Sequence, residues 1–130
     1  MLETGLKHTS ELTVSDAMTA KAVGSGDLPV LATPMMIALM ENAAMLAVQA
    51  HLPEGNTTVG GHIEVSHVRP SKIGDAVQAT AEVIAIKGKK ITYRVEAYCD
   101  GQLIGEGTHL RFMVERDRFL VSCGLQGTCQ

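Results

Sequence analysis

The sequence predicts an α+β domain in which an antiparallel sheet packs against one long helix. Residues 34–51 form a helical stretch that is apolar on nearly every face. From residue 57 onward, apolar and polar residues instead alternate with the period of two that is typical of strands. Short connections between the alternating segments favour antiparallel neighbours. With 130 residues, 45% of them hydrophobic, residues 1–130 are expected to form a single domain.

The N-terminal third supplies one strand and the helix. Residues 6–14 alternate enough to form the first strand, whereas residues 15–32 are rich in small residues, Gly and Pro and predict a loop or flap. Thr33 suits the N-cap of the helix and Pro34 its first turn. The helix is expected to end near His51, before a segment that contains Pro and Gly.

The rest of the chain predicts four further strands, which gives a sheet of about five. These strands are "TTVGGHIEVSHVRP" at 57–70, "DAVQATAEVIAIKG" at 75–88, "KKITYRVEAYCD" at 89–100 and "QLIGEGTHLRFMVE" at 102–115. Gly60-Gly61 within the first of them predicts a bulge or a close approach to the backbone. The tail at 117–130 shows no clear period and is expected to be loosely ordered.

Composition and charge exclude several classes of function. A net charge of -3 and a pI near 5.9 argue against nucleic acid as a partner. The chain shows neither a signal peptide nor a membrane-spanning run, so we expect a cytoplasmic protein without a membrane partner. Its cysteines, Cys99, Cys123 and Cys129, have neither zinc-ligand nor redox spacing, and no metal site is predicted.

The apolar helix also predicts a partner chain. A helix at the surface of a domain normally keeps a wide polar face, which residues 34–51 lack. A second copy of the chain is the simplest cover for the side that the sheet leaves open. We therefore expect a homodimer, with the strand at 57–70 and the helix ends near the interface.

Glu41 is the first candidate for chemistry, because it is the only ionisable residue between Thr33 and Gln49. A carboxylate among apolar side chains is poorly solvated, and this is one way to make a general base or a carboxylate nucleophile reactive. The alternative is that Glu41 lies on a narrow wet stripe or pairs with a cation of the partner chain. Position alone favours neither interpretation.

The other candidates favour structural roles when each is considered alone. His67 shares its strand face with Ile63 and Val65, a setting more typical of a structural histidine. Thr33 lies eight residues before Glu41, about 12 Å along a straight helix, so the two side chains cannot touch directly. Gly60 and Gly61 could present backbone N–H groups to an oxyanion, or simply form a bulge. His109 is interpreted as a surface or structural residue.

Three segments together carry a family resemblance. They are "LATPMMIALMENAA", "TTVGGHIEVSHVRPSKIGDAVQATAEV" and "GKKITYRVEAYCDGQLIGEGTHLR". Over roughly residues 28–112 they resemble the hot-dog acyl-CoA thioesterases, most closely the fluoroacetyl-CoA thioesterase branch. The resemblance implies a sheet wrapped around one central helix. It also implies an active site of Thr33, Glu41 and His67, with Gly60 near the thioester carbonyl.

The implied activity is hydrolysis of an acyl-CoA thioester with a short-chain or small substituted acyl group, with Glu41 as nucleophile or general base. Coenzyme A is then part of the substrate, and no further cofactor is implied. Candidates for its phosphates are cations near predicted turns, which could equally be solvated: Arg69, Lys72, Lys87, Lys89 and Lys90. The alternatives are an enoyl-CoA hydratase or dehydratase on the same fold and a non-catalytic acyl-CoA-binding module. The expected dimer could also pair into a dimer of dimers.

Overall fold

The computed structural model describes residues 1–125. Its helices are a short 3-10 turn at Asp16–Met18, α1 (Ala20–Val23), α2 (Thr33–Gln49) and α3 (Arg116–Ser122). Its strands are β1 (Lys7–Thr13), β2 (Asn56–His67), β3 (Ala76–Lys87), β4 (Lys90–Cys99) and β5 (Gln102–Glu115). All five predicted strands are therefore present, close to their predicted bounds.

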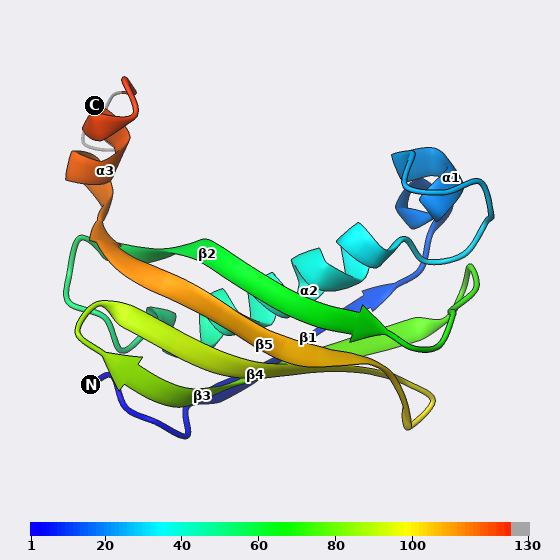
Figure 1. The fold of residues 1–130 in the computed structure, drawn as a ribbon, viewed down its shortest axis with the longest axis horizontal. Helices are drawn as coiled ribbons and strands as arrows, with labels where there is room; N and C mark the ends of the chain where they lie inside the picture. Colours follow the sequence, from blue (N-terminus) through cyan, green and yellow to red (C-terminus); the bar gives the residue numbers. More distant parts are fainter. Residues whose placement is uncertain (126–130) are drawn as a thin grey trace.

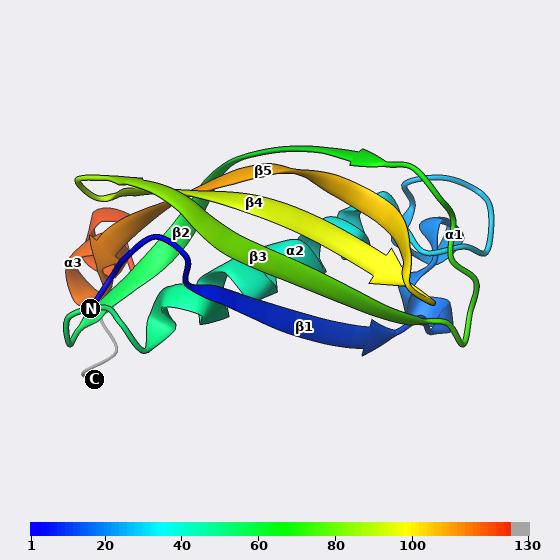
Figure 2. The same cartoon turned by 90° about the horizontal axis from the view of Figure 1, so that it is seen from below.

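The five strands form one antiparallel sheet in the order β1-β3-β4-β5-β2. The sheet curls around α2, which lies along its concave face (Figures 1 and 2). This arrangement confirms the predicted α+β hot-dog fold. The strands β1 and β2 form the two edges, and the start of α2 lies at the same end of the molecule as the end of β2 (Figure 1).

The core lies between α2 and the inner face of the sheet. The helix contributes Met36, Leu39, Met40, Ala43, Ala44, Ala47 and Val48, and the sheet contributes mainly Val77, Ala79, Ala81, Val83, Ile91, Tyr93, Val95, Ala97 and Ile104. Small residues let the two layers approach closely. At Gly105, for example, a Cβ atom would lie only 2.5 Å from the Met36 sulfur. A side chain at this position of β5 would therefore force the Met36 side chain to move.

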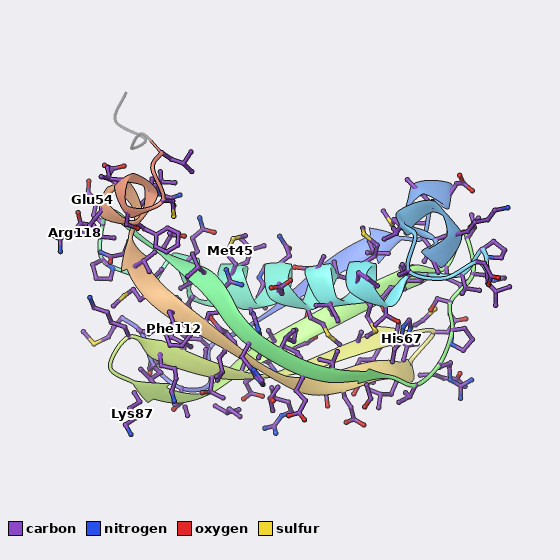
Figure 3. The ribbon with its side chains drawn as sticks, turned by 45° about the horizontal axis from the view of Figure 1, so that its top comes forward. Met45, Glu54, His67, Lys87, Phe112 and Arg118 are labelled. Atoms are coloured by element: carbon purple, nitrogen blue, oxygen red, sulfur yellow. The ribbon has the colours of Figure 1, made fainter. Side chains whose placement is uncertain are left out.

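The side of α2 that faces away from the sheet is exposed in the single chain. Its exposed residues recur at helical spacing and are Pro34, Ala38, Asn42, Leu46 and Gln49. Leu46 is 38% exposed. Figure 3 looks onto this side, marked by Met45, between α1 and α3. The expectation that a second copy covers it stays a prediction.

Local structure differs from expectation at three places. Ala32, not Thr33, is the N-cap of α2 and no side chain caps the helix, whereas its end at Gln49 is close to the expected one. The expected loop at 15–32 holds the 3-10 turn and α1, whose N-cap is the Thr19 hydroxyl. The helix α3 occupies the start of the tail that was expected to be loosely ordered. The end of that tail, with Cys129, lies outside the described residues.

Within residues 1–125, no helix has both the length and the hydropathy that crossing a bilayer requires.

Candidate active site

The predicted bulge in β2 determines which residues face α2. The pairing of β2 with β5 shifts between Gly60 and His62, so Gly61 is the extra residue. Side chains alternate along a strand, and residues seven apart would normally lie on opposite faces. The extra residue reverses this alternation. Gly60 and His67 therefore both face α2, whereas Gly61 lies under the Phe112 ring.

At the N-terminal end of α2, Thr33 and His67 are joined by a hydrogen bond. The Thr33 Oγ1 and the His67 Nδ1 are 2.7 Å apart, and either can donate, depending on the tautomer. The His67 Nε2 is buried without a hydrogen-bond partner among residues 1–125. Burial lowers the pKa of His67, an effect that the nearby backbone of Arg69 partly offsets. The imidazole is therefore neutral at pH 7 and able to accept a proton.

The Thr33–His67 pair lines a hollow of about 310 Å³. The hollow is bounded by Ala20, Ser25, Val30, Leu31, Thr33, His67, Val68, Arg69 and Pro70. Its walls come from α1, the segment before α2 and the turn after β2. The segment at 15–32 therefore forms one wall of the candidate site.

Two turns further along α2, Glu41 is half-buried and faces the backbone of β2. A Cβ atom at Gly60 would lie 2.9 Å from the Glu41 Oε2. The carboxylate therefore occupies space that only glycine leaves free. It lines a second hollow of about 470 Å³, bounded by Ala38, Glu41, Asn42, Met45, Thr58, Val59, Gly60 and Arg111.

Arg111 and His109 of β5 were not among the predicted site residues, yet Arg111 lines this second hollow and His109 lies beside Gly60. His109 is 1% exposed and Arg111 is 7% exposed. Of the two roles expected for His109, a surface or a structural residue, this burial excludes the first. From the position of a Gly60 Cβ, the His109 Cε1 would be 3.4 Å away and the Arg111 Nη1 3.5 Å away. The imidazole and the guanidinium therefore both lie close to the position over Gly60 that the Glu41 carboxylate also approaches.

Arg111 gives this hollow a fixed positive charge. Its Nε donates to the Thr58 hydroxyl at 2.8 Å and its Nη2 to the Thr58 carbonyl at 3.0 Å. Burial lowers the pKa of Arg111, and Tyr93 and Glu41 oppose this effect. Because a guanidinium remains protonated in proteins, the charge persists. A cation held beside Glu41 and Gly60 can stabilise negative charge that develops there.

Thr33 and Glu41 do not meet within one chain. The hollow at Thr33 and the hollow at Glu41 share no lining residue. This agrees with the eight-residue separation along α2, which corresponds to about 12 Å. One chain therefore presents two separate groups: the Thr33–His67 pair, and Glu41 with Gly60, His109 and Arg111.

The candidate cations for CoA phosphates lie in two places. Arg69 lines the Thr33–His67 hollow, and the Lys72 ammonium is 2.7 Å from the Asp75 carboxylate. Lys87, Lys89 and Lys90 belong to the β3–β4 hairpin, and Figure 3 shows Lys87 at the opposite end of the sheet from His67. Arg69 is therefore the candidate nearest to a site residue of its own chain.

Metal ligation has no obvious site in this part of the chain. Among residues 1–125, no three His, Cys, Asp or Glu side chains are grouped closely enough to hold a metal ion.

Comparisons with known proteins agree with this architecture. The family model described as fluoroacetyl-CoA-specific thioesterase matches residues 14–117. A fluoroacetyl-CoA thioesterase from Streptantibioticus cattleyicolor is 34% identical over 90 residues, which are 69% of this chain and 65% of that relative.

Solved structures show the same relationship. A structure of the fluoroacetyl-CoA thioesterase FlK superimposes with a TM-score of 0.88 at 28% identity, covering 95% of this chain and 96% of that one. A thioesterase superfamily member from Thermus thermophilus superimposes with a TM-score of 0.87 at 27% identity, covering 94% of this chain and 90% of that one. The chain therefore belongs to the fluoroacetyl-CoA-specific thioesterase family and has its hot-dog fold.

Proposed function

We propose that the protein hydrolyses an acyl-CoA thioester with a short-chain or small substituted acyl group, giving the free acid and CoA. The observation that carries this proposal is the Glu41 carboxylate, which lines a hollow together with Gly60 and the buried Arg111. Relatives in the same family are named for action on fluoroacetyl-CoA. Coenzyme A is part of this substrate, and the proposal needs no other cofactor.

Glu41 serves as the base or the nucleophile. As a base, it takes a proton from water while the water oxygen attacks the thioester carbonyl. The tetrahedral intermediate then collapses, the C–S bond breaks, and the departing thiolate receives a proton. As a nucleophile, the carboxylate attacks the carbonyl, expels the thiolate and forms an anhydride that water hydrolyses. In both routes Arg111 and the backbone near Gly60 stabilise the oxyanion.

The proposed site is shared between two copies of the chain. The exposed side of α2 is the surface where a second copy would pack, as a homodimer. If the two α2 helices run antiparallel, the Thr33–His67 pair of one copy lies beside Glu41 of the partner subunit. His67, neutral and with a free Nε2, then orients the attacking water or transfers a proton, and Thr33 holds its ring.

A carboxamide in place of the carboxylate tests the chemistry. Glu41→Gln keeps the shape of the side chain but removes the base, so hydrolysis should fall by about a thousandfold. Thiol release from a panel of acyl-CoAs, including fluoroacetyl-CoA, measures the loss and identifies the acyl group. Glu64→Gln, on the exposed face of β2, is the matched control and should retain wild-type turnover.

Three outcomes would contradict the proposal. Near-normal turnover by Glu41→Gln would remove Glu41 from the chemistry. Hydration of an enoyl-CoA without thiol release would indicate a hydratase, and tight acyl-CoA binding without turnover would indicate a binding module. The panel should include an enoyl-CoA so that all three are measured together.

Mixing two inactive variants tests whether the site is shared. Glu41→Gln and His67→Ala each disable every site of their own dimer. In a mixed dimer with shared sites, one site carries both changes and the other carries neither. Random mixing should therefore restore about a quarter of wild-type activity. If each chain holds a complete site, the mixture stays inactive.

A further inference from the structure

The contacts of His109 specify its protonation state. Its Nδ1 lies 2.7 Å from the backbone carbonyl oxygen of His62. A carbonyl oxygen can only accept a hydrogen bond, so Nδ1 carries the proton. Its Nε2 lies 3.3 Å from the Arg111 Nη1. A guanidinium can only donate, so Nε2 carries the lone pair. The two neighbours together require the neutral imidazole with its proton on Nδ1.

The same contacts hold the Arg111 guanidinium in one orientation. Thr58 on β2 accepts from Nε and Nη2, and His109 accepts from Nη1. Nη1 is also the nitrogen that borders the space over Gly60, which the Glu41 Oε2 borders as well. Thr58 therefore fixes Nε and Nη2 of the guanidinium, and His109 fixes Nη1, the nitrogen that borders the space over Gly60.

We propose that His109 is a positioning residue, whose neutral Nδ1–H form holds the Arg111 guanidinium toward Glu41 and Gly60. Protonation of Nε2 would remove the acceptor for Arg111 and place a second cation against it. The arrangement therefore requires neutral His109. The kinetic consequence of this inference rests on the proposed function, whereas the hydrogen-bond arrangement does not.

The groups around His109 favour the neutral form on balance. Arg111 of β5 lies on one side, Glu41 of α2 and His62 of β2 are within electrostatic range, and Tyr93 of β4 stacks on the ring with centroids 5.8 Å apart. Burial is the main effect that lowers the pKa of His109, and Arg111 adds to it. The His62 carbonyl and Glu41 act in the opposite direction. Burial also raises the pKa of Tyr93 to about 12, so Tyr93 carries no charge at neutral pH.

Imidazole ¹⁵N chemical shifts test the arrangement in the wild-type protein without any substrate. At pH 7 we expect His109 as the Nδ1–H tautomer, with a titration midpoint below the ordinary value of 6.5. In Arg111→Ala the midpoint should rise, because the neighbouring cation is gone. An Nε2–H tautomer in the wild type, or an unchanged midpoint in Arg111→Ala, would overturn the inference.

Kinetics of matched variants test the consequence for the site. His109→Leu removes the acceptor and should lower kcat about tenfold with a smaller change in KM. His109→Gln can place a carbonyl oxygen near the position of Nε2 and should recover most of the loss. Tyr93→Phe keeps the stacked ring without the hydroxyl and should retain wild-type kcat. Equal kcat for wild type and His109→Leu, both folded by circular dichroism, would overturn the inference.

The two proposals fail in different ways. A wild-type protein that hydrolyses none of the acyl-CoAs overturns the proposed function. The ¹⁵N measurements then test the hydrogen-bond arrangement of His109 and Arg111 without the kinetics. Hydrolysis by the wild type with an Nε2–H tautomer at His109 supports the proposed function and overturns the inference.

Discussion

The two groups of polar residues along α2 are built in different ways. The Thr33–His67 pair joins the first residue of α2 to the last residue of β2 by one hydrogen bond. Arg111 and His109 instead lie within β5 and are fixed by four hydrogen bonds to each other and to β2. Residues at the ends of elements can shift with the adjoining loops, whereas residues within a sheet are held rigidly. The difference suggests that the groups that stabilise negative charge at Glu41 are preorganised by the sheet. The position of the Thr33–His67 pair depends more on the loops that adjoin α2 and β2.

Among the substitutions that leave the side chains of the proposed site unchanged, Gly60→Ala should have the largest effect, because it disturbs the group around Glu41 directly. The new methyl group would lie 2.9 Å from the Glu41 Oε2 and would displace the carboxylate from its place beside Gly60. Misplacing a catalytic group by about 1 Å can cost roughly a hundredfold in rate, and we expect a loss of that order in kcat. Thiol release under saturating acyl-CoA measures it.

Gly61→Ala is the matched control for this change. Its methyl group meets the Phe112 ring on the opposite face of β2. Phe112 is 38% exposed, so its side chain can move outward. We expect a small loss of thermal stability and a much smaller loss of kcat. If the two alanine variants are equally active, the close fit of Glu41 against Gly60 is unimportant for catalysis.

Thr33→Val should have an intermediate effect, because it removes the hydrogen bond between the Thr33 hydroxyl and the His67 imidazole. The change keeps the branched shape but removes the hydroxyl. One hydrogen bond of this kind contributes about 1 kcal/mol, so kcat should fall about fivefold to tenfold. Thr33→Ser keeps the hydroxyl and should retain most activity. A Thr33→Val enzyme with wild-type kcat and an unchanged pH–rate profile would show that the bond is only structural.

The sequence was most informative where the pattern is long and regular. The alternation of β2 to β5 and the short connections between them identified the strands, and Gly60-Gly61 identified the bulge. The helices α1 and α3 were missed because helices of four and seven residues are too short to show a period. Thr33 was assigned as the N-cap from its residue type, but its hydroxyl bonds His67, 34 residues later in the sequence.

The site was harder to predict than the fold. Glu41 was conspicuous as a lone charge in an apolar helix, whereas His109 and Arg111 lie in a strand with many polar neighbours. Alternation does place both on the same face of β5 as Gly105 and Gly107. Periodicity does not show which element lies opposite that face. The contacts with Thr58 and Gly60 depend on the antiparallel pairing of β2 with β5, which only the structure defines.

Charge substitutions at the two candidate CoA-binding places should have a smaller effect. Arg69→Gln changes a cation beside the Thr33–His67 pair and should raise KM for acyl-CoA about twofold to fivefold at low salt. Lys87→Gln, at the other end of the sheet, is the control and should leave KM unchanged. A raised KM in Lys87→Gln with an unchanged KM in Arg69→Gln would instead indicate that the phosphates of the substrate bind at the β3–β4 hairpin. Either result determines which end of α2 the nucleotide of CoA approaches.

The pH dependence of stability compares the two groups through their histidines and should give the smallest effect. Burial lowers the pKa of both His67 and His109 in the folded chain, below the unfolded value near 6.5. As pH falls below 6.5, the unfolded chain therefore binds protons first, and the free energy of unfolding decreases until the folded histidines also titrate. Above this range the full contribution is present.

Urea unfolding between pH 5 and 8 measures this decrease. His67→Gln and His109→Gln should each flatten the curve, because burial lowers the pKa of both histidines in the folded chain. The exposed His8 provides a control, His8→Gln, which should keep the wild-type curve. A variant curve as steep as that of the wild type would mean that burial does not lower the pKa of that histidine in the folded chain, and the contrast between the Thr33–His67 pair and the group of Arg111 and His109 would then rest on hydrogen-bond geometry alone.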